Sequence, residues 1–147
     1  MSVWGISVTT IMTLNERAYK LATLAHKGQY RRNGEEYICH CERVVQMLMS
    51  LWIKDEVILA TAWLHDTLED TSISISEINN ISKDVANNVL ALSRKEWQLY
   101  QDYIESIKEK DIRMVKICDI VDNLNWQTTH KQRQRYTQAL FYFANLI

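Results

Sequence analysis

The chain has 147 residues, with no proline and only three glycines. Both residue types interrupt helices and form tight turns, so their scarcity favours helices joined by short connections. No segment alternates apolar and polar residues for long enough to predict a sheet. The length suits a single hydrophobic core. The sequence therefore predicts one all-α domain, a bundle of about seven or eight helices.

Cysteine is also scarce, with only Cys39, Cys41 and Cys118. An odd number of cysteines in a chain of this size does not indicate a disulfide framework, and Cys39-His40-Cys41 lacks the CxxC spacing of a zinc knuckle. We therefore expect reduced thiols and a cytoplasmic location.

The chain lacks long apolar runs and an excess of positive charge. No apolar run approaches the roughly 18 residues of a membrane span. The formal net charge is −1, so we expect neither a membrane nor a nucleic acid as partner. The segment 1–12 lacks the basic start of a signal peptide. Two interpretations of it stay open: an N-terminal extension of a domain at 13–147, or a natural translation start at Met12.

Capping signals divide the domain into helices. Thr13 and Glu16 have the spacing of a capping box, as do Ser74 and Glu77, and Gly28 suits the end of the first helix. The expected helices cover about 13–26, 38–52, 55–69, a short segment from 74, a segment from 82 or 84, 97–108, 111–124 and 131–146. Large aromatic side chains are expected in the core rather than at an interface: Trp4, Trp52, Trp97 and Trp126.

The most informative stretch is 60–71, ATAWLHDTLEDT. An apolar helix reaches its end and then presents His65, Asp66, Glu69 and Asp70. Carboxylates are unfavourable at a helix C-terminus because the helix dipole is negative there, and a bound cation would reverse that effect. The alternative is a solvated acidic helix end. Because His65 and Asp66 directly follow apolar residues, we expect them at the edge of the core.

Two further residues interrupt apolar stripes, His40 and Asp119. The alternative for His40 is a hydrogen-bonded structural histidine, and for Asp119 an ion pair with Lys116, three residues earlier. Together with His65 and Asp66 they supply two imidazoles and two carboxylates. This mixed nitrogen and oxygen set suits a catalytic first-row divalent ion.

These residues carry a resemblance to a known family. His40, the His65-Asp66 pair and Asp119 match the H…HD…D pattern of the HD-domain phosphohydrolases. Three segments, 25–40, 64–71 and 115–124, resemble the signatures of the Rel/Spo alarmone hydrolases. The resemblance implies an HD-type helical bundle around one metal ion, usually manganese. It also implies the hydrolytic removal of 3′-pyrophosphate from ppGpp-type nucleotides, the chemistry of the stringent response.

Individual roles follow from the same resemblance. Glu69 and Asp70 match the acidic pair that positions or activates the attacking water. Arg31 matches a side chain that packs on the nucleotide base, and Asn123 one that contacts its sugar or phosphate. Lys27 and Arg32 lie where phosphates could be met. Without the resemblance, the basic residues would form an ordinary solvated turn.

The chain departs from the family pattern at several positions. Cys41 and Glu36 replace prolines, Cys118 replaces an alanine, and Asn125 or Trp126 stands where an arginine is common. No metal ligand is lost, but the departures bear on which nucleotide is bound. Two alternatives therefore stay open. One is a phosphohydrolase of a nucleoside phosphate or a nicotinamide dinucleotide phosphate, releasing orthophosphate. The other is a non-catalytic nucleotide-binding module.

Overall fold

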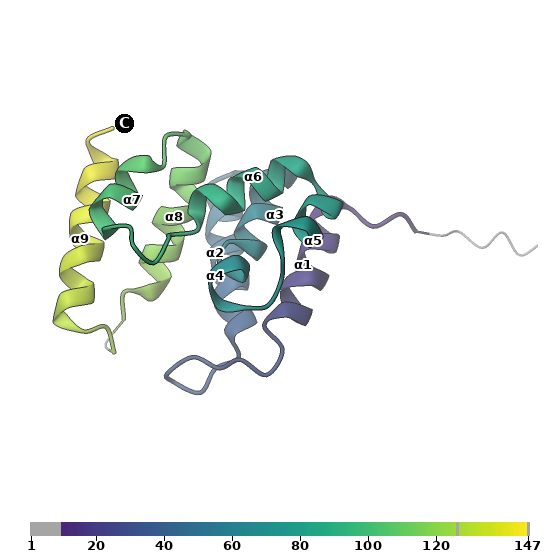
Figure 1. Cartoon of the computed structure of the whole chain (residues 1–147), viewed down its shortest axis with the longest axis horizontal. Coiled ribbons are helices and arrows are strands. Elements are labelled where there is room, and N and C mark those ends of the chain that lie inside the picture. Colours follow the sequence, from purple (N-terminus) through teal and green to yellow (C-terminus); the bar gives the residue numbers. More distant parts are fainter. Residues whose placement is uncertain (1–9, 126, 147) are drawn as a thin grey trace, which may run out of the picture.

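The computed structural model describes residues 10–125 and 127–146, and all regular structure among them is helical (Figure 1). The elements are α1 (Leu14–Ala25), α2 (Tyr37–Ser50), α3 (Glu56–Leu64), α4 (Thr67–Asp70), α5 (Ile75–Ile81), α6 (Lys83–Leu92), α7 (Tyr100–Ser106), α8 (Lys110–Asn123) and α9 (His130–Ala144). The predicted all-α fold is confirmed. None of the described helices is long and apolar enough to cross a membrane.

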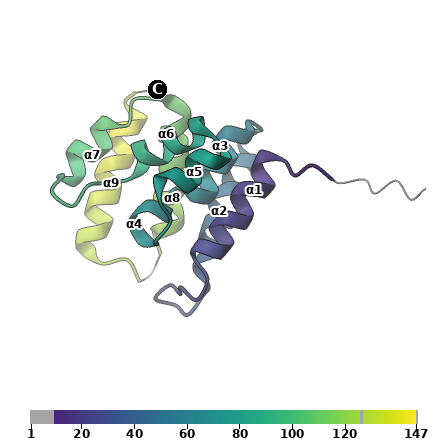
Figure 2. The same cartoon turned by 45° about the vertical axis from the view of Figure 1, so that its right-hand side comes forward.

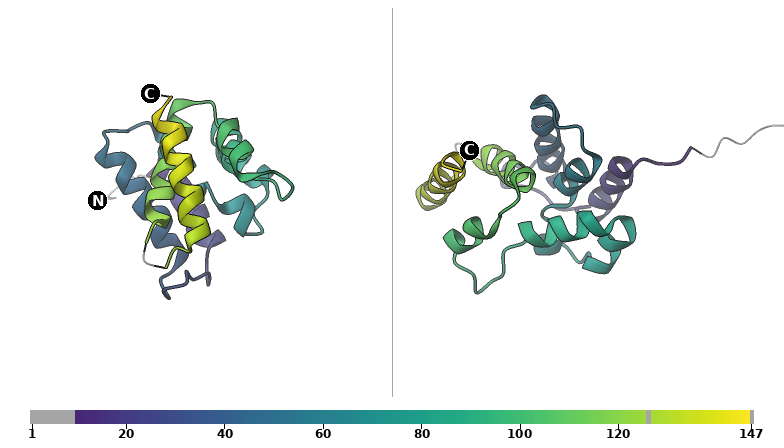
Figure 3. Two further views of the ribbon diagram at one scale, coloured as in Figure 1. Left: turned by 90° about the vertical axis from the view of Figure 1, so that its left-hand side faces the viewer. Right: turned by 90° about the horizontal axis from the view of Figure 1, so that it is seen from above.

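Helix α3 lies at the centre of the bundle (Figures 1 and 2). Every residue from Ile58 to Leu64 is buried. A helix that is apolar on all sides must be surrounded by other elements. Accordingly α3 packs against α1, α2, α6 and α8, while α7, α8 and α9 form one end of the molecule (Figure 3). The central position of α3 places its C-terminal end inside the protein.

The predicted helix starts near 13, 55, 74 and 82 are confirmed, whereas the helix expected at 97–108 is shorter: α7 covers only Tyr100–Ser106, and no side chain caps its start at Leu99. Thr13 and Ser74 each form a capping box with the glutamate three residues later. Asp55 caps α3 by accepting hydrogen bonds from the N–H groups of Val57 and Ile58, and Ser82 caps α6. Such caps satisfy backbone N–H groups that have no partner within the helix, so local sequence alone fixes these boundaries.

The predicted helix at 55–69 is divided into α3 and α4. The helix leaves regular geometry at Asp66, where φ is −99° and ψ is −3°. The Thr67 hydroxyl donates to the carbonyl of Leu64 (2.7 Å) and satisfies one of the carbonyls at the end of α3. His65 and Asp66 therefore lie in a junction between two helices.

Two of the tryptophans expected in the core are on the surface. The exposed fraction is 80% for Trp52 and 78% for Trp97. Trp52 lies just after α2 and Trp97 just before α7. Both are in connecting segments, where helical periodicity does not determine which side chains are buried. Trp4, Trp126 and most of the expected extension at 1–12 lie outside the described residues.

Two connections lie at the lower end of the molecule in Figures 1 and 2, one between α1 and α2 and one between α8 and α9. The first folds back on itself: Arg31 donates its N–H to the carbonyl of Glu35 (2.8 Å), and Gly34 donates to Arg31 (2.9 Å). Gly34 has a φ of +86°, which favours glycine at this turn. This turn determines where Arg31 and Arg32 lie.

Candidate metal centre

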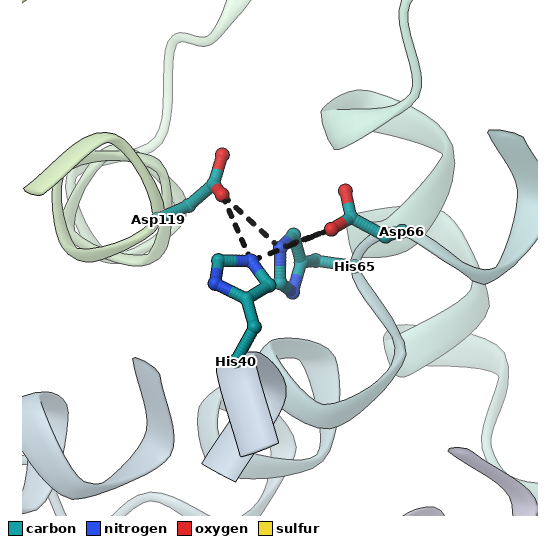
Figure 4. A group of neighbouring side chains, drawn as sticks. All are labelled: His40, His65, Asp66 and Asp119. Carbon is teal, nitrogen blue, oxygen red and sulfur yellow. Dashed lines mark ion pairs between the residues drawn. The ribbon is translucent and has the colours of Figure 1, made fainter. Parts of the chain in front are cut away.

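Four side chains from three parts of the chain converge at the inner end of α3 (Figure 4). His40 comes from α2, His65 and Asp66 from the α3–α4 junction, and Asp119 from α8. Each offers one ligand atom, and these atoms all lie within 4.8 Å of one another. The structure thus brings together the four residues that interrupted the apolar pattern.

The spacing of the ligand atoms suits a metal ion. First-row ions bind nitrogen and oxygen at about 2.1 Å, so adjacent ligands lie about 3.0–3.4 Å apart. In the cluster, the distances between ligand atoms are His65 Nε2–Asp66 Oδ2 at 2.9 Å, His40 Nε2–Asp119 Oδ1 at 3.2 Å, His65 Nε2–Asp119 Oδ1 at 3.4 Å and His40 Nε2–Asp66 Oδ2 at 3.5 Å. The cluster can therefore hold one divalent ion with only small adjustments.

The two imidazoles are oriented as metal ligands. Nδ1 of His65 lies 2.7 Å from the carbonyl of Ala62, and because a carbonyl only accepts, Nδ1 carries the hydrogen. Nδ1 of His40 lies 2.6 Å from Oδ2 of Asp122. Both Nε2 atoms are buried, and no described group forms a hydrogen bond with either. A neutral imidazole in this tautomer directs its Nε2 lone pair at the cluster, which is the arrangement that metal binding requires.

The electrostatics of the cluster favour a positive charge at its centre. Burial lowers the pKa of His40, but the carboxylates of Asp119, Asp122 and Asp66 outweigh it and raise that pKa to about 9. Burial raises the pKa of Asp119, yet Lys116 and the two histidines hold it well below its usual range. The carboxylates are thus ionised. Their negative charge, which in the absence of a cation favours the protonated form of His40, would equally favour a bound divalent cation.

Asp119 has a different partner at each oxygen. Oδ2 accepts a hydrogen bond from Nζ of Lys116 (2.7 Å). Oδ1 faces the histidines and also accepts from Nδ2 of Asn123 (2.7 Å). Asp119 can therefore pair with Lys116 and belong to the cluster at the same time, because each interaction uses a different oxygen of its carboxylate.

Tyr37 is a member of the site that the sequence did not reveal. Its hydroxyl donates to Oδ2 of Asp66 (2.6 Å) and lies 3.3 Å from Oδ2 of Asp70. Burial and the carboxylates of Asp66 and Asp70 raise the pKa of Tyr37, so its phenol keeps its proton. The ring stacks on His26 and meets His40 edge-on. Tyr37 thereby fixes Asp66 and links it to Asp70.

Glu69 and Asp70 lie beside the cluster rather than in it. Partial desolvation raises the pKa of each carboxyl, and the negative charge of Asp66 adds to the effect. Glu69 accepts a hydrogen bond from the backbone N–H of Arg94, beyond the end of α6. The pair is not part of the group of four that could hold an ion.

Asp122 is a second residue that sequence reasoning missed. Its carboxylate accepts from His40, from Nε of Arg43 (2.6 Å) and from Nη1 of Arg31 (3.0 Å). The one available signal was its position on α8, one turn after Asp119. Its neighbours in sequence are partly polar, so it does not stand out from an apolar stripe.

A pocket of about 220 Å³ adjoins the cluster. Three residues that line it, Tyr37, Asp122 and Asn123, also form hydrogen bonds with members of the cluster. The other lining residues are mostly cationic or amide side chains: Arg31, Arg32, Asn33, Arg43, Asn125, Gln127, Thr128, Gln132 and Tyr136. Lys27 is not among them. It is exposed beside Tyr19 and Leu24 along α1.

The HD domain family model matches residues 18–145, and the chain belongs to this family.

Among individual relatives, the guanosine-3′,5′-bis(diphosphate) 3′-pyrophosphohydrolase of Aquifex aeolicus is 31% identical over 130 residues, covering 82% of this chain and 18% of that protein. The bifunctional (p)ppGpp synthase/hydrolase SpoT of Escherichia coli strain K12 is 33% identical over 121 residues, covering 74% of this chain and 17% of that protein. A GTP pyrophosphokinase of Streptomyces coelicolor is 26% identical over 152 residues, covering 94% of this chain and 18% of that protein. The chain thus spans about a fifth of the length of these curated relatives.

The fold is also that of a solved structure, a metazoan ortholog of SpoT that hydrolyzes ppGpp. The TM-score is 0.73 at 23% identity, over 93% of this chain and 84% of that one.

Proposed function

We propose that this chain is a metal-dependent phosphohydrolase that removes pyrophosphate from the 3′ position of a guanosine 3′,5′-bis(diphosphate)-type nucleotide. The observation that carries the proposal is the pair of buried Nε2 atoms of His40 and His65, which form no hydrogen bond with any described group and face the carboxylates of Asp66 and Asp119. The names of the relatives support the choice of substrate. We assign the activity to one domain at 13–147.

The residues present fit a divalent ion, and we propose that His40, His65, Asp66 and Asp119 hold one Mn²⁺ or another first-row divalent cation. When bound, such an ion polarises a phosphoryl oxygen and lowers the pKa of bound water toward neutrality. We also propose a cytoplasmic location, in keeping with the three free cysteines.

The acidic pair supplies the proton transfer. Glu69 accepts the proton of the attacking water, because its raised pKa brings it closer to the operating pH than an ordinary glutamate. Asp70 positions that water, and the Tyr37 hydroxyl between Asp66 and Asp70 holds both carboxylates in place.

The adjoining pocket binds the nucleotide. The guanidinium of Arg31 donates in its own plane to Asp122 and Asn123, so these two bonds do not occupy the faces that would stack on a purine base. Arg32 and Asn123 line the same pocket and meet phosphate or sugar oxygens. Lys27, which the resemblance places among the phosphate contacts, would have to reach the substrate from outside the pocket.

A second candidate is a phosphohydrolase of another nucleotide, a nucleoside phosphate or a nicotinamide dinucleotide phosphate. The observation that favours it is the amide-rich wall of the pocket, where Asn125 and Gln127 stand near the position of an arginine common in the family. A non-catalytic nucleotide-binding module is disfavoured, because Glu69 and Asp70 lie beside an intact set of ligands.

The test is a turnover assay of the purified chain with manganese against a panel of nucleotides, with release of pyrophosphate and orthophosphate measured separately. We expect pyrophosphate from ppGpp, and no activity after removal of metal with a chelator. Orthophosphate from another nucleotide, with no pyrophosphate from ppGpp, would replace the first proposal by the second. Tight nucleotide binding without any turnover would overturn both.

A further inference from the structure

Asp122 connects the proposed nucleotide pocket to His40. Its side chain is only 8% exposed. Oδ2 accepts from Nδ1 of His40 at 2.6 Å and from Nη1 of Arg31 at 3.0 Å, so one oxygen atom joins the two residues. Arg43 donates to both oxygens, from Nε to Oδ1 at 2.6 Å and from Nη2 to Oδ2 at 3.1 Å. The carboxylate therefore cannot turn without breaking bonds on both sides.

A second connection runs parallel to the first. Nη2 of Arg31 donates to Oδ1 of Asn123 at 2.7 Å. Nδ2 of Asn123 in turn donates to Oδ1 of Asp119 at 2.7 Å, the oxygen that faces the histidines. Arg31 thus reaches both His40 and Asp119, each through one intervening side chain.

This arrangement matters for metal binding. A carboxylate bonded to the far nitrogen of a ligating histidine fixes the tautomer and orientation of the ring and raises its basicity. Arg31 and Arg43 keep Asp122 in place and ionised, while Asn123 aims Oδ1 of Asp119. Removing the Arg31 guanidinium would loosen the supports of two ligands at once.

We propose that Arg31 and Asp122 are positioning residues for the metal site, so that a side chain of the nucleotide pocket sets the affinity of the protein for its divalent ion. The inference rests on the metal site of the proposed function but not on the identity of the nucleotide. Arg32 offers a matched control, because it lies in the same turn and lines the same pocket. Its one described hydrogen bond joins Nη1 to the carbonyl of Gln127 at 3.3 Å.

The experiment measures the dissociation constant for Mn²⁺ alone, by calorimetry or by competition with a chelating dye, without nucleotide or turnover. We expect Arg31→Ala to weaken Mn²⁺ binding by about tenfold, the lower end of the range for groups that support metal ligands. Arg32→Ala should bind Mn²⁺ as tightly as the wild type, because the described hydrogen bond of the Arg32 side chain goes to Gln127 and not to Asp122 or Asn123. Equal affinities in all three proteins would overturn the inference, as would equal losses in the two variants.

Asp122→Asn provides an independent variant. It keeps an oxygen for Nδ1 of His40 but removes the charge that holds the arginines, and we expect Mn²⁺ affinity to fall by about 10- to 100-fold. The melting temperature is measured with chelator and with Mn²⁺. A positioning role reduces the upward shift caused by Mn²⁺, whereas a purely structural role lowers both temperatures equally and would overturn the inference. Wild-type protein that binds Mn²⁺ but does not hydrolyse ppGpp would refute the proposed function while leaving this inference standing.

Discussion

The four-residue cluster and the pocket beside it are built in different ways. His40 and Asp119 lie on long helices that contact each other, and His65 and Asp66 directly follow the central helix. Half of the residues that line the pocket belong to the two connections at the lower end of the molecule and half to α2, α8 and α9, and their side chains are mostly polar. The cluster is enclosed by the core, whereas the pocket opens toward solvent.

The difference between the enclosed cluster and the open pocket matches the different demands of binding a metal ion and binding a nucleotide. A metal ion needs ligands held to within a few tenths of an ångström, which packed helices provide. A nucleotide is bound by many weaker contacts, several of them from loops, and most of these contacts do not support the cluster as Arg31 does. We therefore expect substitutions in the cluster to abolish function and substitutions in the pocket to alter it by degrees.

The largest effect is expected from His65→Ala. It removes one of the four proposed ligand atoms, so bound metal should fall from about one ion per chain to none, with all turnover lost. Metal content after dialysis checks this result. His130→Ala, at the exposed start of α9, serves as the control. Unchanged metal content in the His65 variant would refute the site assignment.

Glu69→Gln should leave metal binding intact and remove the proton acceptor. We expect kcat to fall by about 10²-fold or more, the scale of a lost general base. The same change at Glu96, an exposed residue of the α6–α7 connection, should have no effect. Near-normal turnover in the Glu69 variant would mean that another group takes the proton.

The pH dependence distinguishes Glu69 from the metal ligands. A general base must be ionised, and partial desolvation raises the pKa of Glu69 above 4.5. Its contribution is therefore complete above that raised pKa and falls about tenfold for each pH unit below it. The ratio of kcat/KM between wild type and Glu69→Gln, measured with saturating metal at each pH, cancels any loss of metal. The ratio should decline toward acid pH, and a constant ratio would contradict this role.

Smaller effects are expected in the pocket. At saturating Mn²⁺, Arg31→Ala should raise KM by an amount equivalent to about 1–3 kcal/mol, the range for a base stacked on a side chain. Arg31→Lys should recover only part of the lost affinity, because lysine keeps the charge but lacks the planar guanidinium.

Lys27→Ala should change KM least, since Lys27 lies outside the pocket. Steady-state pyrophosphate release gives all three values. A larger loss at Lys27 than at Arg31 would place the phosphates along α1 instead.

Much of the fold could be predicted because its signals are local. Capping boxes at Thr13 and Ser74 and the scarcity of glycine and proline act over a few residues. The four residues of the cluster stood out for a related reason: each polar side chain interrupts an apolar stripe, and such a residue needs a partner.

The parts that could not be predicted depend on contacts distant in sequence. Asp122 bonds to His40, 82 residues away, and its polar neighbours hide it. From the sequence alone, Tyr37 looks like an ordinary core aromatic residue. Its role depends on the hydrogen bond from its hydroxyl to Asp66, 29 residues away. The surface positions of Trp52 and Trp97 likewise depend on which faces of the bundle are left uncovered.

The two histidines of the cluster differ in whether a single mutation can remove the group that orients the ring. The ring of His65 is held by the main-chain carbonyl of Ala62, an atom that every amino acid possesses, so no substitution at that position deletes it. The ring of His40 is held by the side chain of Asp122, which a single codon change can remove. The support of His65 is thus protected from mutation, whereas the support of His40 can be changed. Among descendants of this chain, drift in metal affinity should therefore arise at position 122 before position 62.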